Sequence, residues 1–211
     1  MKLGAILLAW FGYFALHSLL AAARFKGWIG NRWPRFMPRY RIVFNATAAV
    51  TLLPVLWLVY GGESIWLWQW KGSWAWIANG LALAAIVCLF ASARIYDMDE
   101  FLGLRQLREH GNDFSQTFTI STLHRFVRHP WYCIGLVLIW TRDMTEPLLI
   151  SALAITAYLF IGSKFEEWKL IDSYGERYRG YMAAVPGLVP LPWKCLTAEE
   201  AKTLMDSPDL R

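Results

Sequence analysis

Three apolar runs, each about as long as a bilayer is thick, constrain this chain more than any other feature. The first, Leu3–Ala23, is apolar apart from His17 and Ser18. At a rise of about 1.5 Å per residue, such a helix extends about 30 Å, the thickness of the hydrocarbon core. Two further runs of similar length are Ile42–Tyr60 and Trp74–Ala93. The sequence therefore predicts three full membrane spans.

A cleaved signal peptide is the competing interpretation of the first run. Lys2 precedes the run, and Ala21-Ala22-Ala23 resembles a cleavage site. The run is long for the apolar part of a signal peptide, however, and basic residues follow it directly. We therefore expect a retained span.

Two shorter apolar runs follow the polar stretch Arg94–His129. Trp131–Trp140 is about half a span long, and Pro147–Gly162 follows it after a short polar turn. Re-entrant segments in a tight helical hairpin and two full crossings both remain open, and each returns the chain to the side it left. The predicted fold class is all-α: a polytopic transmembrane helical bundle of about five membrane helices, three full spans plus a short hairpin, with a cytoplasmic amphipathic C-terminal helix.

Composition agrees with a membrane protein. The chain is 56% hydrophobic and 18% charged, against about 25% charged residues in an ordinary soluble domain. Interfaces of the bilayer accommodate surplus tryptophan. Six of the 13 tryptophans cluster where an aromatic belt is expected: Trp57, Trp66, Trp68, Trp70, Trp74 and Trp76.

One integral-membrane domain over residues 1–211 is expected from this length. Its parts would be the three spans (1–93), a second half with the hairpin and tail helix (94–192), and a polar tail (193–211). The three cysteines form no C-x-x-C pair, so we expect neither a disulfide framework nor a metal site.

Basic residues predict the orientation. The loop after the first span has no acid and six basic residues, whereas Gly61–Ser73 has Lys71 opposed by Glu63. Positive-inside reasoning places the first loop, the Arg94–His129 stretch and the tail in the cytoplasm and the N-terminus outside, in a bacterial inner membrane. The net charge of +5 is then explained by topology and anionic lipid. We expect no nucleic acid and no obligate protein partner. The six basic residues are Arg24, Lys26, Arg32, Arg35, Arg39 and Arg41.

Arg128-His129-Pro130 immediately precedes the fourth apolar run. Proline favours the first turn of a helix, and it pushes the residue before it out of helical geometry, so a bend is expected at His129. A helix N-terminus beside two basic side chains can bind an anionic group. Positive-inside anchoring before a proline-initiated helix explains the same residues, and spacing alone leaves both interpretations open.

The tail contains a second patterned segment. Five residues at spacings of 4, 3, 4 and 3 predict one face of a single helix from about Lys164 to Met182, which Gly175 interrupts. One interpretation is an amphipathic helix that rests on the membrane. The other is a helix that closes a cytoplasmic pocket with tyrosines and a carboxylate. The five residues are Glu167, Ile171, Tyr174, Tyr178 and Tyr181.

These two segments together resemble a known signature. Its first part is Arg128-His129-Pro130-x-Tyr132-x-x-Gly135, and its second is Glu166-Glu167-x-x-Leu170 followed by Tyr174-Gly175-x-x-Tyr178-x-x-Tyr181 and Val185-Pro186. The combination is similar to the isoprenylcysteine carboxyl methyltransferase-like superfamily of integral-membrane, S-adenosylmethionine-dependent methyltransferases. Looser matches in the N-terminal half, at His17-Ser18 and at Phe101–Gln106, resemble the subgroup of methanethiol S-methyltransferase, NnrU and nurim.

The resemblance implies a cofactor site for S-adenosyl-L-methionine, with S-adenosyl-L-homocysteine as product. It places Arg128 and His129 near the methionine carboxylate and Tyr132 in the wall. Leu170 and the two acids before it would also bind the cofactor, and two tyrosines would close the cytosolic face. The residues implied are Arg128, His129, Tyr132, Glu166, Glu167, Leu170, Tyr178 and Tyr181.

No catalytic side chain is assigned. His17 and Asn45 are acceptor-side candidates, because polar groups within spans are costly and are often functional. A backbone or headgroup hydrogen bond to His17 is the alternative. Asp143 is expected to form a local ion pair with Arg142.

The expected function is methyl transfer to a small or lipophilic acceptor: a thiol, a prenylcysteine carboxylate or a lipid amine. In-line displacement requires alignment and exclusion of water more than acid–base groups. Membrane lipid and the acceptor itself are the expected partners. Alternatives are a non-catalytic NnrU- or nurim-like membrane protein and, less favoured, an NADPH-dependent membrane reductase.

Overall fold

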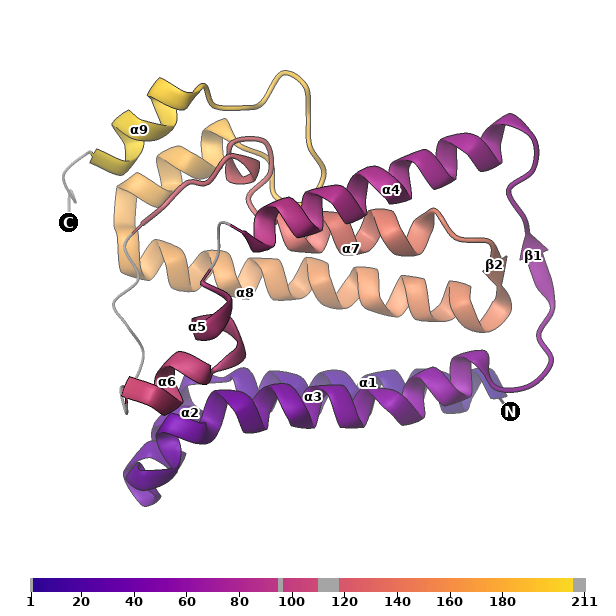
Figure 1. Ribbon diagram of the computed structural model, residues 1–211, viewed down its shortest axis with the longest axis horizontal. Coiled ribbons are helices and arrows are strands. Elements are labelled where there is room, and N and C mark those ends of the chain that lie inside the picture. Colours follow the sequence, from indigo (N-terminus) through magenta and orange to yellow (C-terminus); the bar gives the residue numbers. More distant parts are fainter. Residues whose placement is uncertain (1, 95–96, 110–117, 207–211) are drawn as a thin grey trace. The chain divides into compact units, whose positions relative to one another are not determined.

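The computed structural model describes residues 2–94, 97–109 and 118–206, which are largely helical (Figure 1). Within this part, the chain forms two compact units. Unit one contains residues 2–69, 97–109 and 143–154, and unit two contains residues 70–94, 118–142 and 155–206. Both units consist of separated stretches of the chain. The boundaries suggested by sequence, 1–93, 94–192 and 193–211, stay a prediction. Residues 207–211 of the predicted polar tail lie outside the described residues.

Unit one is built on two long helices, α1 (Lys2–Ala21) and α3 (Met37–Tyr60), which pack side by side (Figure 1). Between them, the chain forms α2 (Ala23–Arg32) and the short 3₁₀ helix η1 (Pro34–Phe36). The hydroxyl of Tyr40 in α3 donates to the carbonyl of Leu20 in α1, 2.6 Å away. This bond fixes the two helices to each other near the end of α1.

A two-stranded antiparallel ladder completes the opposite end of unit one. Strand β1 (Trp66–Trp68) pairs with β2 (Met144–Thr145), a feature that hydropathy does not predict. The buried indole of Trp10 donates to Ser151 Oγ across 2.9 Å. Ser151 lies near the start of α8 (Glu146–Ala184), so this bond joins the beginning of α8 to α1.

Two short helices, α5 (Met98–Leu102) and α6 (Leu104–Glu109), contact α3 within unit one. Gly103 between them has φ 91°, a left-handed conformation that glycine adopts without strain. A Cβ here would lie 2.9 Å from both Arg41 Cβ and the backbone nitrogen of Ile42. Glycine is therefore required twice, for its backbone conformation and for the close approach to α3.

In unit two, α4 (Ser73–Ala93) packs against α7 (Pro130–Trp140). Small residues of α4 are buried, namely Ala78, Ala82 and Ala85, which allows the close approach of another helix. The remaining elements are the part of α8 from residue 155, the 3₁₀ helix η2 (Leu123–Arg125) and α9 (Ala198–Asp206).

Helix α8 differs from the prediction. Sequence reasoning separated an apolar run ending at Gly162 from a tail helix starting near Lys164, but one helical segment covers both. Nothing at the polar boundary breaks a helix, and Ser163 Oγ donates back to the Phe160 carbonyl, 2.7 Å away. The break lies at Gly175, which has the non-helical φ 56° and ψ −133°. Figure 1 shows that the ribbon of α8 turns sharply along its course. The prediction that Lys164–Met182 forms a single helix with one common face is therefore wrong.

In the part of the chain that the structure describes, four helical segments are long and apolar enough to cross a membrane: α1, Pro34–Tyr60, α4 and α8. Helix α7 is shorter, at about 16 Å. Large apolar side chains project outward, with Leu8 74% and Trp76 83% exposed. Lipid is the solvent that suits such surfaces. The all-α polytopic membrane fold is confirmed, and the protein is a multi-pass membrane protein.

A hydrophobic cluster in unit two packs the tail against the loop before α7. Phe118 contacts the rings of Tyr174, Tyr178 and Tyr181, with centroids 5.2, 6.2 and 5.8 Å away. The Tyr181 hydroxyl donates to the carbonyl of His124, 2.6 Å away. The buried members of the cluster are Ile120, Tyr178, Tyr181, Val185, Leu196 and Ala201.

His124 is half-buried beside this cluster, and its Nδ1 lies 2.7 Å from Ser121 Oγ. Burial, reinforced by the charge of His129, lowers the pKa of His124 from 6.5 to about 4. The imidazole is therefore neutral at pH 7, and the folded state resists its protonation. A depressed histidine pKa contributes stability that is present above pH 6.5 and is lost as the pH falls toward 4.

We predict that acidification from pH 7 to pH 4.5 lowers the free energy of unfolding by about 2–3 kcal/mol through this one group. His124→Gln removes the titrating group, so the variant should lose most of this pH dependence. Thermal unfolding of both proteins in detergent, followed by circular dichroism, measures the difference. Identical pH profiles of variant and wild type would contradict the prediction.

Candidate functional site

The bend before α7 is paired with the chain that follows α8. The backbone nitrogen of Arg128 donates to the Pro186 carbonyl at 2.8 Å, and that of His129 donates to the Gly187 carbonyl at 3.1 Å. His129 has the non-helical φ −120° and ψ 71° expected of a residue before proline, and α7 begins at Pro130. The two halves of the sequence signature are thus held together by main-chain hydrogen bonds.

A buried ion pair joins the same two halves. Nε and Nη2 of Arg128 donate to Glu167 Oε1, at 3.0 and 2.6 Å. Nη1 of Arg128 donates to the carbonyls of Met182, at 3.0 Å, and Val185. The side chains of Arg128 and Glu167 are 7% and 2% exposed. Each nitrogen of the guanidinium is therefore already bound by the protein.

The protein also surrounds the carboxylate of Glu167. His129 Nε2 lies 3.2 Å from Oε1, and Lys164 Nζ donates to Oε2 at 3.0 Å. Burial alone would raise the pKa of Glu167, but the hydrogen bonds from Arg128 and Lys164 outweigh burial and hold the pKa below its ordinary value. Glu167 is therefore ionised at neutral pH and serves to connect structural elements.

Glu166, the adjacent residue, is in a different environment. Its side chain is 49% exposed, and its Oε2 accepts a hydrogen bond from the Tyr132 hydroxyl at 3.2 Å and lies 3.4 Å from His129 Nδ1. The rings of His129 and Tyr132 stack with centroids 5.3 Å apart. Burial would raise the pKa of Glu166, but the hydrogen bond and charge of His129 outweigh it and lower the pKa. An ionised, partly exposed carboxylate remains here for a ligand.

Five of the residues singled out by sequence thus form one polar cluster in unit two, while three others belong to the hydrophobic cluster of the same unit. Tyr178 and Tyr181 are 2% and 3% exposed within the hydrophobic cluster, against which Leu170 packs. Burial, followed by the nearby charge of Glu167, raises the pKa of Tyr178. Tyr178, Tyr181 and Leu170 thus pack within the hydrophobic cluster rather than in the polar one. The five clustered residues are Arg128, His129, Tyr132, Glu166 and Glu167.

The two acceptor-side candidates belong to unit one. His17 lies among aromatic rings, with centroids 6.0 Å from Tyr13 and 4.9 Å from Phe44. Asn45 Nδ2 donates to the carbonyls of Phe101 and Leu102, at 3.2 and 3.3 Å. The amide of Asn45 therefore holds α5 against α3.

Sequence reasoning missed two parts of this arrangement. Lys164 precedes Glu167 by three residues on one helix, a spacing that could have indicated their ion pair. The carbonyls of Met182, Val185, Pro186 and Gly187 have no such signal, because any residue supplies a carbonyl.

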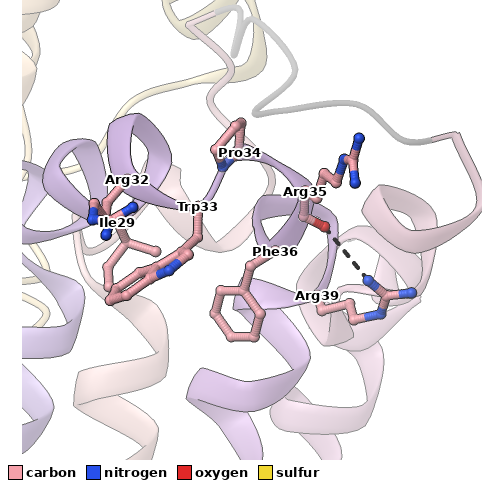
Figure 2. Close-up of a pocket in the computed structure, with 7 residues that line it drawn as sticks. All are labelled: Ile29, Arg32, Trp33, Pro34, Arg35, Phe36 and Arg39. Carbon is pink, nitrogen blue, oxygen red and sulfur yellow. Dashed lines mark hydrogen bonds between the residues drawn. The ribbon is translucent and has the colours of Figure 1, made fainter.

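Sequence reasoning also missed an open pocket of about 690 Å³ in unit one (Figure 2). That pocket is lined by Ile29, Arg32, Trp33, Pro34, Arg35, Phe36 and Arg39.

Within the described residues, no group of three or more His, Cys, Asp or Glu side chains is arranged to hold a metal ion. The polar cluster instead offers a carboxylate, an imidazole and a phenol. Such groups can bind an organic ligand that carries an ammonium group and hydroxyls.

Comparison with known proteins finds methyltransferases. Methanethiol S-methyltransferase 2 of Bradyrhizobium diazoefficiens is 34% identical over 180 residues, which cover 82% of this chain and 68% of the relative. The methanethiol S-methyltransferase of a Pseudomonas species is 33% identical, with coverage of 88% and 72%. That of Mycobacterium tuberculosis is also 33% identical, with coverage of 86% and 75%.

No family model and no solved structure matches the chain. The relatives nevertheless agree with the superfamily and subgroup that the signature residues indicate, and they show that the protein is a methyltransferase. With identity above 30% over most of its length, and with four helices among the described residues that are long and apolar enough to cross a membrane, the chain belongs to the methanethiol S-methyltransferase family of membrane methyltransferases.

Proposed function

We propose that the protein transfers the methyl group of S-adenosyl-L-methionine to a small thiol at the cytoplasmic face of a bacterial inner membrane. The observation that carries the proposal is the agreement of two findings: relatives named methanethiol S-methyltransferase, and the cluster around Glu166. In the reaction, the acceptor sulfur bonds to the methyl carbon while the carbon–sulfonium bond breaks. The products are a thioether and S-adenosyl-L-homocysteine, and the thiol proton passes to water.

The residues around Glu166 fit the methyl donor. S-adenosyl-L-methionine supplies an electrophilic methyl group on a sulfonium, and it also carries an ammonium group and ribose hydroxyls. The half-exposed Glu166 carboxylate can accept hydrogen bonds from such donors, with His129 and Tyr132 fixing its orientation. This assignment gives the three residues the cofactor-binding role that their resemblance to the superfamily implies.

Arg128 and Glu167 have a positioning role in this proposal. Their contacts to each other and to the main chain leave no guanidinium nitrogen unbound by protein, so neither needs to touch the donor. They hold His129 and the start of α7 against α8. Tyr178, Tyr181 and Leu170 support the same segment through the hydrophobic cluster.

The acceptor is proposed to be small, uncharged when protonated and soluble in the bilayer. A thiol reacts as its thiolate, and in-line displacement then depends on alignment and exclusion of water. His17 remains the acceptor-side candidate, whereas the Asn45 amide has the structural role of holding α5. The basic loop after α1 supports a cytoplasmic site, with the N-terminus outside and the C-terminus inside.

Membranes that contain the protein should convert methanethiol and methyl-labelled S-adenosylmethionine into labelled dimethyl sulfide, measured by gas chromatography of the headspace. Membranes without the protein are the control. Label found in lipid or in a prenylcysteine analogue would contradict the thiol acceptor.

Calorimetry of the purified protein should detect binding of S-adenosylhomocysteine and no binding of NADPH. A reductase would bind NADPH, and a non-catalytic membrane protein would bind neither.

We expect Glu166→Gln to weaken S-adenosylhomocysteine binding by about tenfold or more, because a charged hydrogen-bond acceptor contributes about 1.5–3 kcal/mol. Calorimetry measures the affinity, and the unfolding midpoint should change little. Glu176→Gln, in the same helix but paired with Arg179 on the surface, is the matched control and should keep its affinity. Equal affinities of the two variants would count against the proposed site.

Glu167→Gln should act mainly on stability. It leaves Arg128 buried without its counter-charge, a change that typically costs about 3–5 kcal/mol. The free energy of unfolding in detergent should fall accordingly, while Glu176→Gln, which removes half of an exposed pair, should change it little. A Glu167→Gln protein as stable as wild type would show that the pair does not hold the unit together.

A further inference from the structure

The pocket of unit one (Figure 2) lies where η1 joins α2 to α3. Its interior is mostly apolar, since buried Ile29 and the rings of Trp33 and Phe36 line it together with Pro34. An apolar lining of this kind does not by itself attract a small inorganic ion, because an ion would lose hydration without compensation. The interior instead suits hydrocarbon.

Three arginines border the same pocket. Arg35 and Arg39 lie on one side of Phe36, and Arg32 lies with Ile29 on the other (Figure 2).

Local contacts hold these side chains near the pocket. Arg39 Nη1 donates to the Arg35 carbonyl at 3.4 Å, and the Arg32 guanidinium lies 5.6 Å from the ring centroid of Trp33. Within the described residues none of the three arginines forms an ion pair with an acid, and the sequence has no Asp or Glu before Glu63. In this part of the chain, no acidic side chain neutralises the positive charge of the pocket.

The pocket lies between two candidate membrane spans. Helix α1 ends at Ala21, and the next apolar span begins at Pro34. Trp28 and Trp33 are 55% and 48% exposed, and their rings meet edge to face at 5.6 Å. Tryptophan is enriched where headgroups meet hydrocarbon. A segment with these features is expected at the depth of lipid phosphates.

We propose that this pocket binds the headgroup and glycerol region of an anionic glycerophospholipid. The arginines would bind the phosphate, which guanidinium groups recognise well, and the apolar interior would bind the first carbons of the lipid. The acyl chains would continue along exposed apolar residues of the two spans, such as Leu19 and Val43. Charge attracts the lipid, and the lining distinguishes it from a free phosphate.

Calorimetry of the full chain in detergent tests this proposal with short-chain phosphatidylglycerol, short-chain phosphatidylcholine and inorganic phosphate as probes. Wild type should prefer phosphatidylglycerol over both other probes. The Arg35→Gln/Arg39→Gln variant should lose about fivefold in affinity for each arginine removed, because one basic side chain near an anionic lipid surface typically strengthens binding by about this factor. The Arg35→Lys/Arg39→Lys variant keeps the charge and should retain most of the preference.

Arg24→Gln is the matched control, because Arg24 is an exposed arginine of the same loop that does not line the pocket. Its preference should equal that of wild type, and an equal loss in Arg24→Gln would overturn the proposal in favour of general attraction to the basic loop. Inorganic phosphate that binds as tightly as phosphatidylglycerol would overturn it in favour of a free-anion site.

Phe36→Ala should weaken phosphatidylglycerol binding while all three arginines remain, and an unchanged affinity would also contradict the proposal.

Discussion

The buried ion pair between Arg128 and Glu167 is the interaction on which unit two depends. It joins the bend before α7, the stretch of α8 that precedes Gly175, and the chain at and after the end of α8. Two charges removed from water cost more than their attraction returns unless further hydrogen bonds satisfy them. The carbonyls of Met182 and Val185, His129 and Lys164 supply those bonds, so the segments are held in one specific arrangement.

This arrangement explains why two adjacent glutamates have different roles. Successive residues of a helix point about 100° apart. Glu167 therefore faces Arg128 in the interior, while Glu166 lies at the edge and meets His129 and Tyr132. His129 contacts both carboxylates, so the stability of the buried pair fixes the orientation of the groups proposed to bind the methyl donor.

In unit one, apolar side chains and a few polar contacts take the place of such an ion pair. The long helices of this unit expose apolar side chains to lipid, and polar contacts are concentrated at their ends, as with Tyr40 and Leu20. The close approach of Gly103 to α3 and the amide bonds of Asn45 hold the short helices α5 and α6 in place. The arginines of the pocket lie between α1 and the apolar span that begins at Pro34.

Hydropathy along the chain is enough to identify a membrane protein and to locate its apolar helices, because hydrocarbon thickness fixes the length of a span and leaves few alternatives. The sequence also predicted the start of α7 at Pro130 and, through the signature, the residues that gather around Glu166. The separate roles of these residues follow from contacts between segments that are distant in the sequence. Arg128 meets a partner 39 residues away and several main-chain carbonyls, contacts that leave no sequence pattern. The course of α8 to Gly175 and the burial of Tyr178 likewise depend on packing, which periodicity does not encode.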